Sequence, residues 1–193
     1  ISRIVRKLLN MPELGIDIEE SVQRACYFYG KTINPAVVYE TFAKDAQTFS
    51  FDNPDVPGRW VAASYYILTI GNSLKEEFEK KPDIFGQYTT QIVSAISADT
   101  LEQSKSFVQK LIVSEAADEQ CEVSRGIELP QDKYNDISKI LPAEKINVSV
   151  SENGQFTPEY TIAGVFYWIP LKRRKLRLSY IREQIARFPI LKH

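Results

Sequence analysis

The start of the chain places its apolar residues with the period of a helix. From Ile1 to Leu9 they recur at the i, i+3, i+4, i+7 spacing that lines one helical face, with basic side chains off that face. The same spacing returns from Ile18 to Tyr29, and Gly30 suits the end of a helix. Two amphipathic helices are therefore predicted within the first 30 residues.

Helices are also predicted across the next part of the chain. Asn34 followed by Pro35 is typical of an N-cap and first-turn pair, and it would open a helix through Phe49. The prolines within 52–58 indicate a loop. The run over 59–81, which is free of charge from 60 to 74, is predicted as a long helix that ends before proline.

The middle of the chain continues in the same way. Residues 83–98 are predicted as a helix of their own. Asp99 and Glu102 have the spacing of a capping box, which predicts a new helix from there to about Glu119. Residues 130–141 fit one short helix.

A different period appears after residue 142. Apolar and polar residues alternate over 146–151, as in a half-buried strand. Asn153-Gly154 favours a hairpin turn, and 155–169 is predicted as the returning strand with its aromatic residues in the core. The last element predicted is an amphipathic helix over 179–188.

The predicted fold class is mainly α, of the α+β type. It has a helical body of about five to seven helices over 1–142, followed over 143–193 by a β-hairpin and a terminal helix. The two parts are expected to pack as one domain, because 193 residues suit a single core. No membrane span is expected, because the longest charge-free stretches, 60–74 and 84–98, are shorter than the ~20 apolar residues that a bilayer requires.

Charge is divided unevenly along the chain. The net charge is only −1, but residues 171–193, here called the basic segment, contain eight basic residues against Glu183 alone, a net +7. The first ten residues carry +3, so 11–170 carry −11. Such asymmetry indicates a polyanionic or acidic partner. The residues predicted to make this contact are Lys172, Arg173, Arg174, Lys175, Arg177 and Arg182.

Several partners fit the basic segment. Nucleic acid is one, because each neutralised phosphate releases counterions. An acidic protein, an anionic membrane surface, a nuclear-import signal and a merely solvated connector are the others. If the helix that reaches Glu119 extends further, four carboxylates line one face as an acidic docking face: Glu115, Asp118, Glu119 and Glu122. That face could dock the basic segment of this or another copy, hold a divalent cation, or simply be solvated.

Several kinds of chemistry have little support in the sequence. The single histidine is His193, so histidine-based catalysis and metal ligation are not expected. The glycines form no phosphate-binding loop. Cys26 and Cys121 fit inert thiols in a reducing compartment, although one bridge between them stays open. No catalytic, metal or cofactor site is predicted.

The leading interpretation is a non-enzymatic assembly or binding protein of the intracellular space, whose basic segment contacts nucleic acid or an acidic protein surface. A coat- or nucleocapsid-like homo-oligomer would fit. One alternative is a carboxylate-based enzyme, assisted by a divalent metal or not. The other is a structural subunit of a larger complex.

Overall fold

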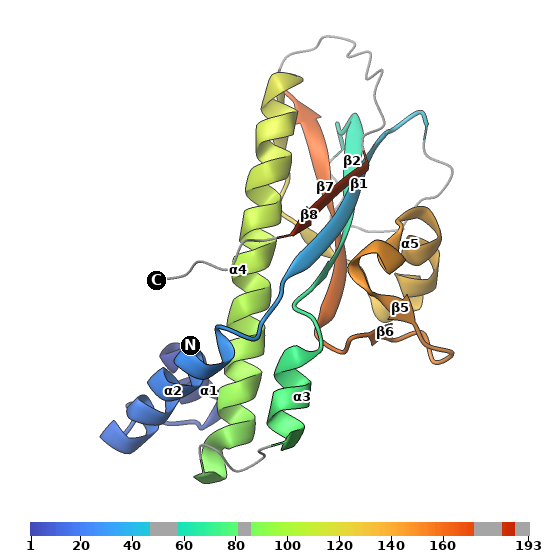
Figure 1. The fold of residues 1–193 in the computed structure, drawn as a ribbon. Coiled ribbons are helices and arrows are strands. Elements are labelled where there is room, and N and C mark those ends of the chain that lie inside the picture. Colours follow the sequence, from blue (N-terminus) through green and yellow to red (C-terminus); the bar gives the residue numbers. More distant parts are fainter. Residues whose placement is uncertain (47–57, 81–85, 172–182, 188–193) are drawn as a thin grey trace.

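A computed structural model describes residues 1–46, 58–80 and 86–171, and the backbone of 183–187 (Figure 1). Its helices are α1 (Ser2–Leu8), α2 (Ile16–Tyr29), α3 (Ser73–Lys80), α4 (Thr89–Asp118) and α5 (Tyr134–Ile140). Its strands are β1 (Ala36–Ala43), β2 (Ala62–Thr69), β3 (Cys121–Val123), β4 (Ile127–Glu128), β5 (Ser149–Val150), β6 (Phe156–Thr157), β7 (Thr161–Pro170) and β8 (Glu183–Arg187). Three single 3₁₀ turns are η1 (Gly86–Tyr88), η2 (Gln131–Lys133) and η3 (Ala143–Ile146).

The centre of the fold is an antiparallel sheet in the order β3-β7-β2-β1-β8, with β4 also paired to β7. Ala36 of β1 lies opposite Thr69 of β2, and Ala62 of β2 lies opposite Trp168 of β7. Strands from both sides of residue 142 thus join one sheet. A two-stranded ladder, β5 with β6, stands apart from it.

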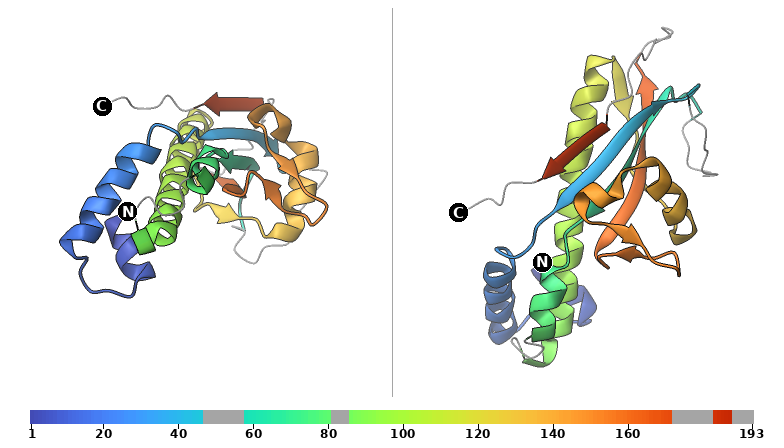
Figure 2. Two further views of the ribbon diagram at one scale, coloured as in Figure 1. Left: turned by 60° about the horizontal axis from the view of Figure 1, so that its bottom comes forward. Right: turned by 45° about the vertical axis from the view of Figure 1, so that its right-hand side comes forward.

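Helices and the small ladder cover the two faces of the sheet. The second half of α4 lies on one face, where Ile112 packs with Tyr66 and Phe166. On the other face, α5 and the β5–β6 ladder pack against residues such as Tyr65 and Tyr167. Figure 2 shows these layers from two further directions. The sheet is therefore covered on both sides, by α4 on one and by α5 with the β5–β6 ladder on the other.

The first half of α4 extends beyond the sheet. Its 30 residues make a rod of about 45 Å, and α1, α2 and α3 pack around this protruding end (Figure 1). Asp99 lies in the middle of the rod, 3.8 Å from the terminal ammonium of Ile1. The prediction of a helix start at Asp99 is wrong, because α4 is continuous from Thr89.

Two predicted helices contain strands. Within the helix expected over 34–49, residues Ala36–Ala43 form β1, and within the helix expected over 59–81, residues 62–69 form β2 and only 73–80 are helical, as α3, after a turn at Gly71 with φ +80°. Residues 47–49 and 81 of these two predictions lie outside the described residues. The reason is that every residue of β2 is buried. A strand covered on both faces has no polar alternation, and its continuous apolar run resembles that of a buried helix.

Other predictions agree with the structure. Helices α1 and α2 lie where the apolar period indicated, α5 lies within the short helix predicted over 130–141, and α4 ends at Asp118, close to the predicted end at Glu119. Phe156, Phe166 and Trp168 are core residues, as expected. Phe166 and Trp168 pack on the α4 side of the sheet, and Phe156 packs with the equally buried Tyr167 on the α5 side.

The predicted β-hairpin and the predicted terminal helix differ from the structure in their pairing and in their secondary structure. The turn at 151–155 joins β5 to β6, with Gly154 at φ +72°, but the long β7 pairs with β2, β3 and β4. Of the terminal helix predicted over 179–188, residues 179–182 and 188 lie outside the described residues. The part that is described, 183–187, runs along β1 as strand β8.

Candidate functional site

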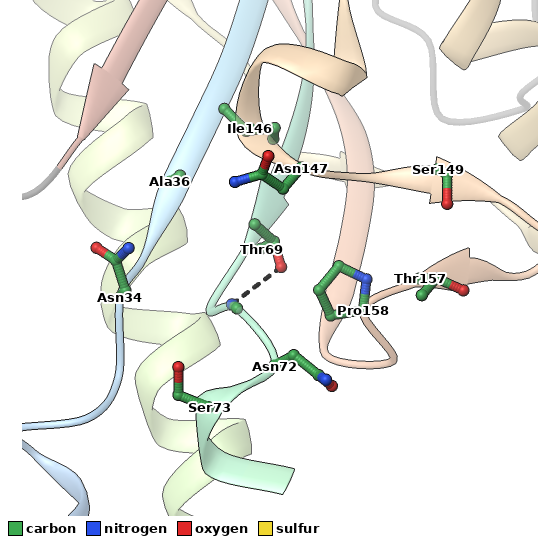
Figure 3. Close-up of a pocket in the computed structure, with 11 residues that line it drawn as sticks. Asn34, Ala36, Thr69, Asn72, Ser73, Ile146, Asn147, Ser149, Thr157 and Pro158 are labelled. Carbon is green, nitrogen blue, oxygen red and sulfur yellow. Dashed lines mark hydrogen bonds between the residues drawn. The ribbon is translucent and has the colours of Figure 1, made fainter. Parts of the chain in front are cut away.

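A groove lined by polar side chains lies at one end of the sheet. Here β1 begins, β2 ends, and the β5–β6 ladder stands opposite them (Figure 3). The groove, called the polar groove below, consists of two adjoining hollows of about 410 and 540 Å³. Both are lined by Asn72, Thr157 and Pro158, so one elongated ligand can contact both. Their volumes lie within the range of small-molecule sites.

The inner hollow is bounded by three segments that are distant in the sequence. They are the chain before β1, the turn from β2 into α3, and the chain from η3 to β6. Among the described residues, its polar lining is uncharged: Asn34, Thr69, Asn72, Ser73, Asn147, Ser149 and Thr157. Carboxamides and hydroxyls both donate and accept hydrogen bonds. The inner hollow therefore suits an uncharged ligand rich in such groups.

Hydrogen bonds fix the turn that forms the floor of this hollow. The Thr69 hydroxyl accepts a bond of 3.1 Å from the N–H of Gly71 and one of 2.9 Å from the Thr161 hydroxyl. Asn147, across the hollow, has φ +57°, a left-handed conformation that asparagine tolerates better than most residues. The turn after β2 is thus held in place by the Thr69 hydroxyl, and the side of the hollow across from it is shaped by the left-handed backbone at Asn147.

Several lining groups have no use within the protein. Among the described residues, the side chains of Asn34, Ser73 and Asn147 form no hydrogen bond, and the same holds for those of Ser149 and Thr157. By contrast, Asn72 in the same hollow donates to Glu76 Oε1 at 2.8 Å. Five unengaged hydrogen-bonding groups around one hollow are available to a ligand.

The outer hollow contains an ion pair. Of the described residues lining either hollow, only Lys75 and Glu159 are ionised, and their Nζ and Oε2 atoms are 3.0 Å apart. The hydrogen bond and the negative charge of Glu159 raise the pKa of Lys75, so it remains an ammonium at neutral pH. Tyr134 and Phe156 also line this hollow, and their rings are stacked, with centroids 4.1 Å apart and an angle of 22° between the ring planes.

None of the sites predicted from sequence is part of the described lining of the groove. Lys172, Arg173, Arg174, Lys175, Arg177 and Arg182 all fall outside the described residues. The acidic docking face was predicted on the condition that one helix extends past Glu119. That condition fails, because α4 ends at Asp118 and Gln120 takes a φ of +58°.

The four carboxylates are consequently spread over three local structures. Glu115 and Asp118 lie in the last turns of α4, Glu119 caps the helix, and Glu122 is on β3. Glu115 also accepts a hydrogen bond of 2.8 Å from the hydroxyl of Tyr39 on β1. These residues do not form a single row along a helix.

Neither thiols nor metal ligands gather in the part of the chain that the structure describes. It holds no group of three or more His, Cys, Asp or Glu residues arranged to bind a metal. Cys26 and Cys121 are both free, and burial raises the pKa of each thiol. No helix within the described ranges is long and apolar enough to cross a membrane.

Sequence reasoning missed the polar groove. Asn, Ser and Thr are common on any protein surface. The first and last contributing residues, Asn34 and Thr157, are more than a hundred positions apart in the sequence. The left-handed Asn147 and the turn at Gly71 have no sequence signal strong enough to single them out. Only the pairing of β1 with β2 and of β2 with β7 brings them together.

Comparisons with known proteins give a fold and no family. No protein-family model and no curated protein matches the sequence. Among solved structures, the crystal structure of the MetH reactivation domain bound to AdoHcy is similar, with a TM-score of 0.54 over 88% of this chain and 71% of that one. The two sequences are 13% identical, so the likeness defines the class of fold alone.

Proposed function

We propose that this chain is a non-enzymatic binding module that holds a small metabolite in the polar groove. The observation that carries this proposal is the set of unengaged amide and hydroxyl groups, which includes Asn34 and Asn147, around one hollow. Four of these side chains are exposed, so a ligand that displaces the water on them can take up their hydrogen bonds. Convergent polar groups in a concave site are the usual features of a ligand site.

The lining of the inner hollow is compatible with the nucleoside part of an adenosyl thioether. A purine edge and a ribose diol are uncharged and both donate and accept hydrogen bonds, which matches the carboxamides and hydroxyls of the inner hollow. The MetH reactivation domain, whose fold is similar, was crystallised with AdoHcy. We therefore propose AdoHcy or a closely related molecule for this chain.

Calorimetric titration with AdoHcy tests the proposal. Asn34→Ala and Asn147→Gly each remove one carboxamide, and glycine accommodates the left-handed backbone at position 147. Each variant is expected to weaken binding by about three- to tenfold, since one hydrogen bond contributes roughly 0.5–1.5 kcal/mol. Ser106→Ala, on the exposed surface of α4, is the matched control and should bind like the wild type. Absence of binding at millimolar AdoHcy would contradict the proposal.

A second function is favoured by the charge division. We propose that the basic segment contacts nucleic acid or an acidic protein surface, because it carries +7 while 11–170 carry −11. Contact between copies, with Glu115, Asp118, Glu119 and Glu122 as the acidic side, is the homo-oligomeric form of this proposal.

Retention on a polyanion column at several salt concentrations tests the second function. The informative variant changes Lys172, Arg173, Arg174, Lys175 and Arg177 to glutamine. Wild-type retention should fall steeply with salt, and the variant should elute early throughout. Sedimentation at low and high salt tests contact between copies. A polyanion affinity that survives the substitutions would rule out this segment as the contact.

A further inference from the structure

The ion pair in the outer hollow has a use beyond the proposed function, on which this inference rests. We infer that Lys75 and Glu159 receive the zwitterionic end of the bound metabolite. The α-carboxylate of an amino-acid group would pair with Lys75 and its α-ammonium with Glu159. The uncharged body of the same ligand would extend past Asn72 into the inner hollow.

The charges that line the groove match those of a zwitterion. The groove contains one ammonium and one carboxylate among its described lining residues and no other charge. A ligand with a net charge would leave one ionised group of the site or of the ligand uncompensated, which is unfavourable wherever water is displaced. A ligand end with both charges, set side by side, satisfies Lys75 and Glu159 together. Such an end is an amino acid.

Both side chains of the ion pair are accessible to a ligand. The side chain of Lys75 is 43% exposed and that of Glu159 is 65% exposed, so both can exchange one partner for another without unfolding. An exposed ion pair contributes only about 0–1 kcal/mol to folding. Separating Lys75 from Glu159 to admit a zwitterion is therefore inexpensive, and four charges in alternation are better paired than two.

The ion pair lies beside the residues that the two hollows share. Lys75 lies on α3, one turn beyond Asn72, and Glu159 directly follows Pro158. Asn72 and Pro158 line both hollows, so the charged end of the groove adjoins its uncharged part. AdoHcy has the same order of groups: a zwitterion, a thioether chain, and an uncharged nucleoside.

The test compares AdoHcy with 5′-methylthioadenosine, which keeps the adenosyl thioether and lacks the amino acid. The wild type should bind AdoHcy at least about tenfold more tightly. The double variant Lys75→Gln with Glu159→Gln should bind both molecules with the affinity that the wild type has for methylthioadenosine. The matched control is Lys80→Gln with Glu77→Gln, which removes another exposed ion pair of α3, at 2.6 Å, that lines neither hollow.

Each outcome separates the inference from the proposed function. If the wild type binds the two molecules equally, or if the Lys75/Glu159 variant keeps the preference for AdoHcy, the inference is wrong and the binding function stands. If neither molecule binds, both fail. Loss of preference in the Lys80/Glu77 control would assign the effect to the general charge of α3 and would also overturn the inference. Circular dichroism of each variant confirms the fold.

Discussion

Tyr39 donates a hydrogen bond of 2.8 Å to Glu115, and this bond ties the middle of the sheet to the far end of α4. Tyr39 is almost fully buried on β1, on the face that α4 covers. Because its acceptor is a carboxylate, the bond is stronger than one between neutral groups. One of the four carboxylates expected to form a docking face thus also has a structural role.

Tyr39→Phe should lower the free energy of unfolding by about 1.5–3 kcal/mol, because it leaves Glu115 without this donor. The matched variant is Tyr66→Phe. Tyr66 is equally buried, but its hydroxyl has no hydrogen-bond partner among the described residues. Removing that hydroxyl should be neutral or slightly stabilising. Urea denaturation measures both changes. Equal losses in the two variants would mean that Tyr66 has a partner, and the contrast would fail.

Ser64→Ala should cost about 2–3 kcal/mol of unfolding free energy. The Ser64 hydroxyl is fully buried, accepts a bond of 2.8 Å from Trp168 Nε1, and lies 2.7 Å from the Thr41 hydroxyl. Its removal leaves two buried groups unsatisfied. Ser138→Ala, outside the core on α5, is the control and should change stability by less than about 0.5 kcal/mol. A loss at Ser64 no larger than at Ser138 would show that the buried groups find other partners.

Gly164→Ala should destabilise the centre of the sheet. A Cβ at this position of β7 would lie 2.5 Å from Cζ of Tyr66, inside van der Waals contact, so the ring or the strand must shift. Overpacking of this kind costs about 1–3 kcal/mol. Gly58→Ala, where a Cβ meets nothing within 4 Å, is the control. Thermal unfolding should show a clear decrease in Tm for Gly164→Ala alone, and an unchanged Tm would mean that the Tyr66 ring moves freely.

Stability should decline at alkaline pH. Burial raises the pKa of Tyr66, Tyr134 and Tyr167 above the usual value near 10. The folded state therefore holds these phenolic protons more tightly than the unfolded state. Their contribution is fully present below about pH 10 and is lost as the pH rises through the higher folded values.

Unfolding curves between pH 8 and 12, with phenolate absorbance recorded alongside, measure this dependence. Tyr27 provides the control, because it is exposed and the hydrogen bond from Lys31 lowers its pKa. Tyr27 should ionise first and without loss of structure, and Tyr27→Phe should remove part of the early absorbance change. A midpoint for unfolding that is constant up to pH 12 would contradict the expectation.

The sequence by itself determined the helices that keep one face in water. In α1 and α2 the apolar residues of the buried face recur at helical spacing and most of the other residues are polar, with Leu8, Ile16 and Tyr27 as exposed exceptions. The part of α4 from Asp99 to its end was expected from the capping-box spacing of Asp99 and Glu102, and the part before it from a separate predicted helix over 83–98. The division of charge between 11–170 and the basic segment also follows from composition alone.

Only the tertiary structure decided the sheet and the groove. Because α4 covers one face of β2 and α5 with the β5–β6 ladder covers the other, β2 has no polar side, and local periodicity cannot distinguish it from a buried helix. Asn34, Asn72 and Asn147 become neighbours only when antiparallel pairing places the start of β1 beside the end of β2 and opposite the β5–β6 ladder. A binding site made from separate segments has no local pattern, since its geometry is produced by long-range hydrogen bonding and burial.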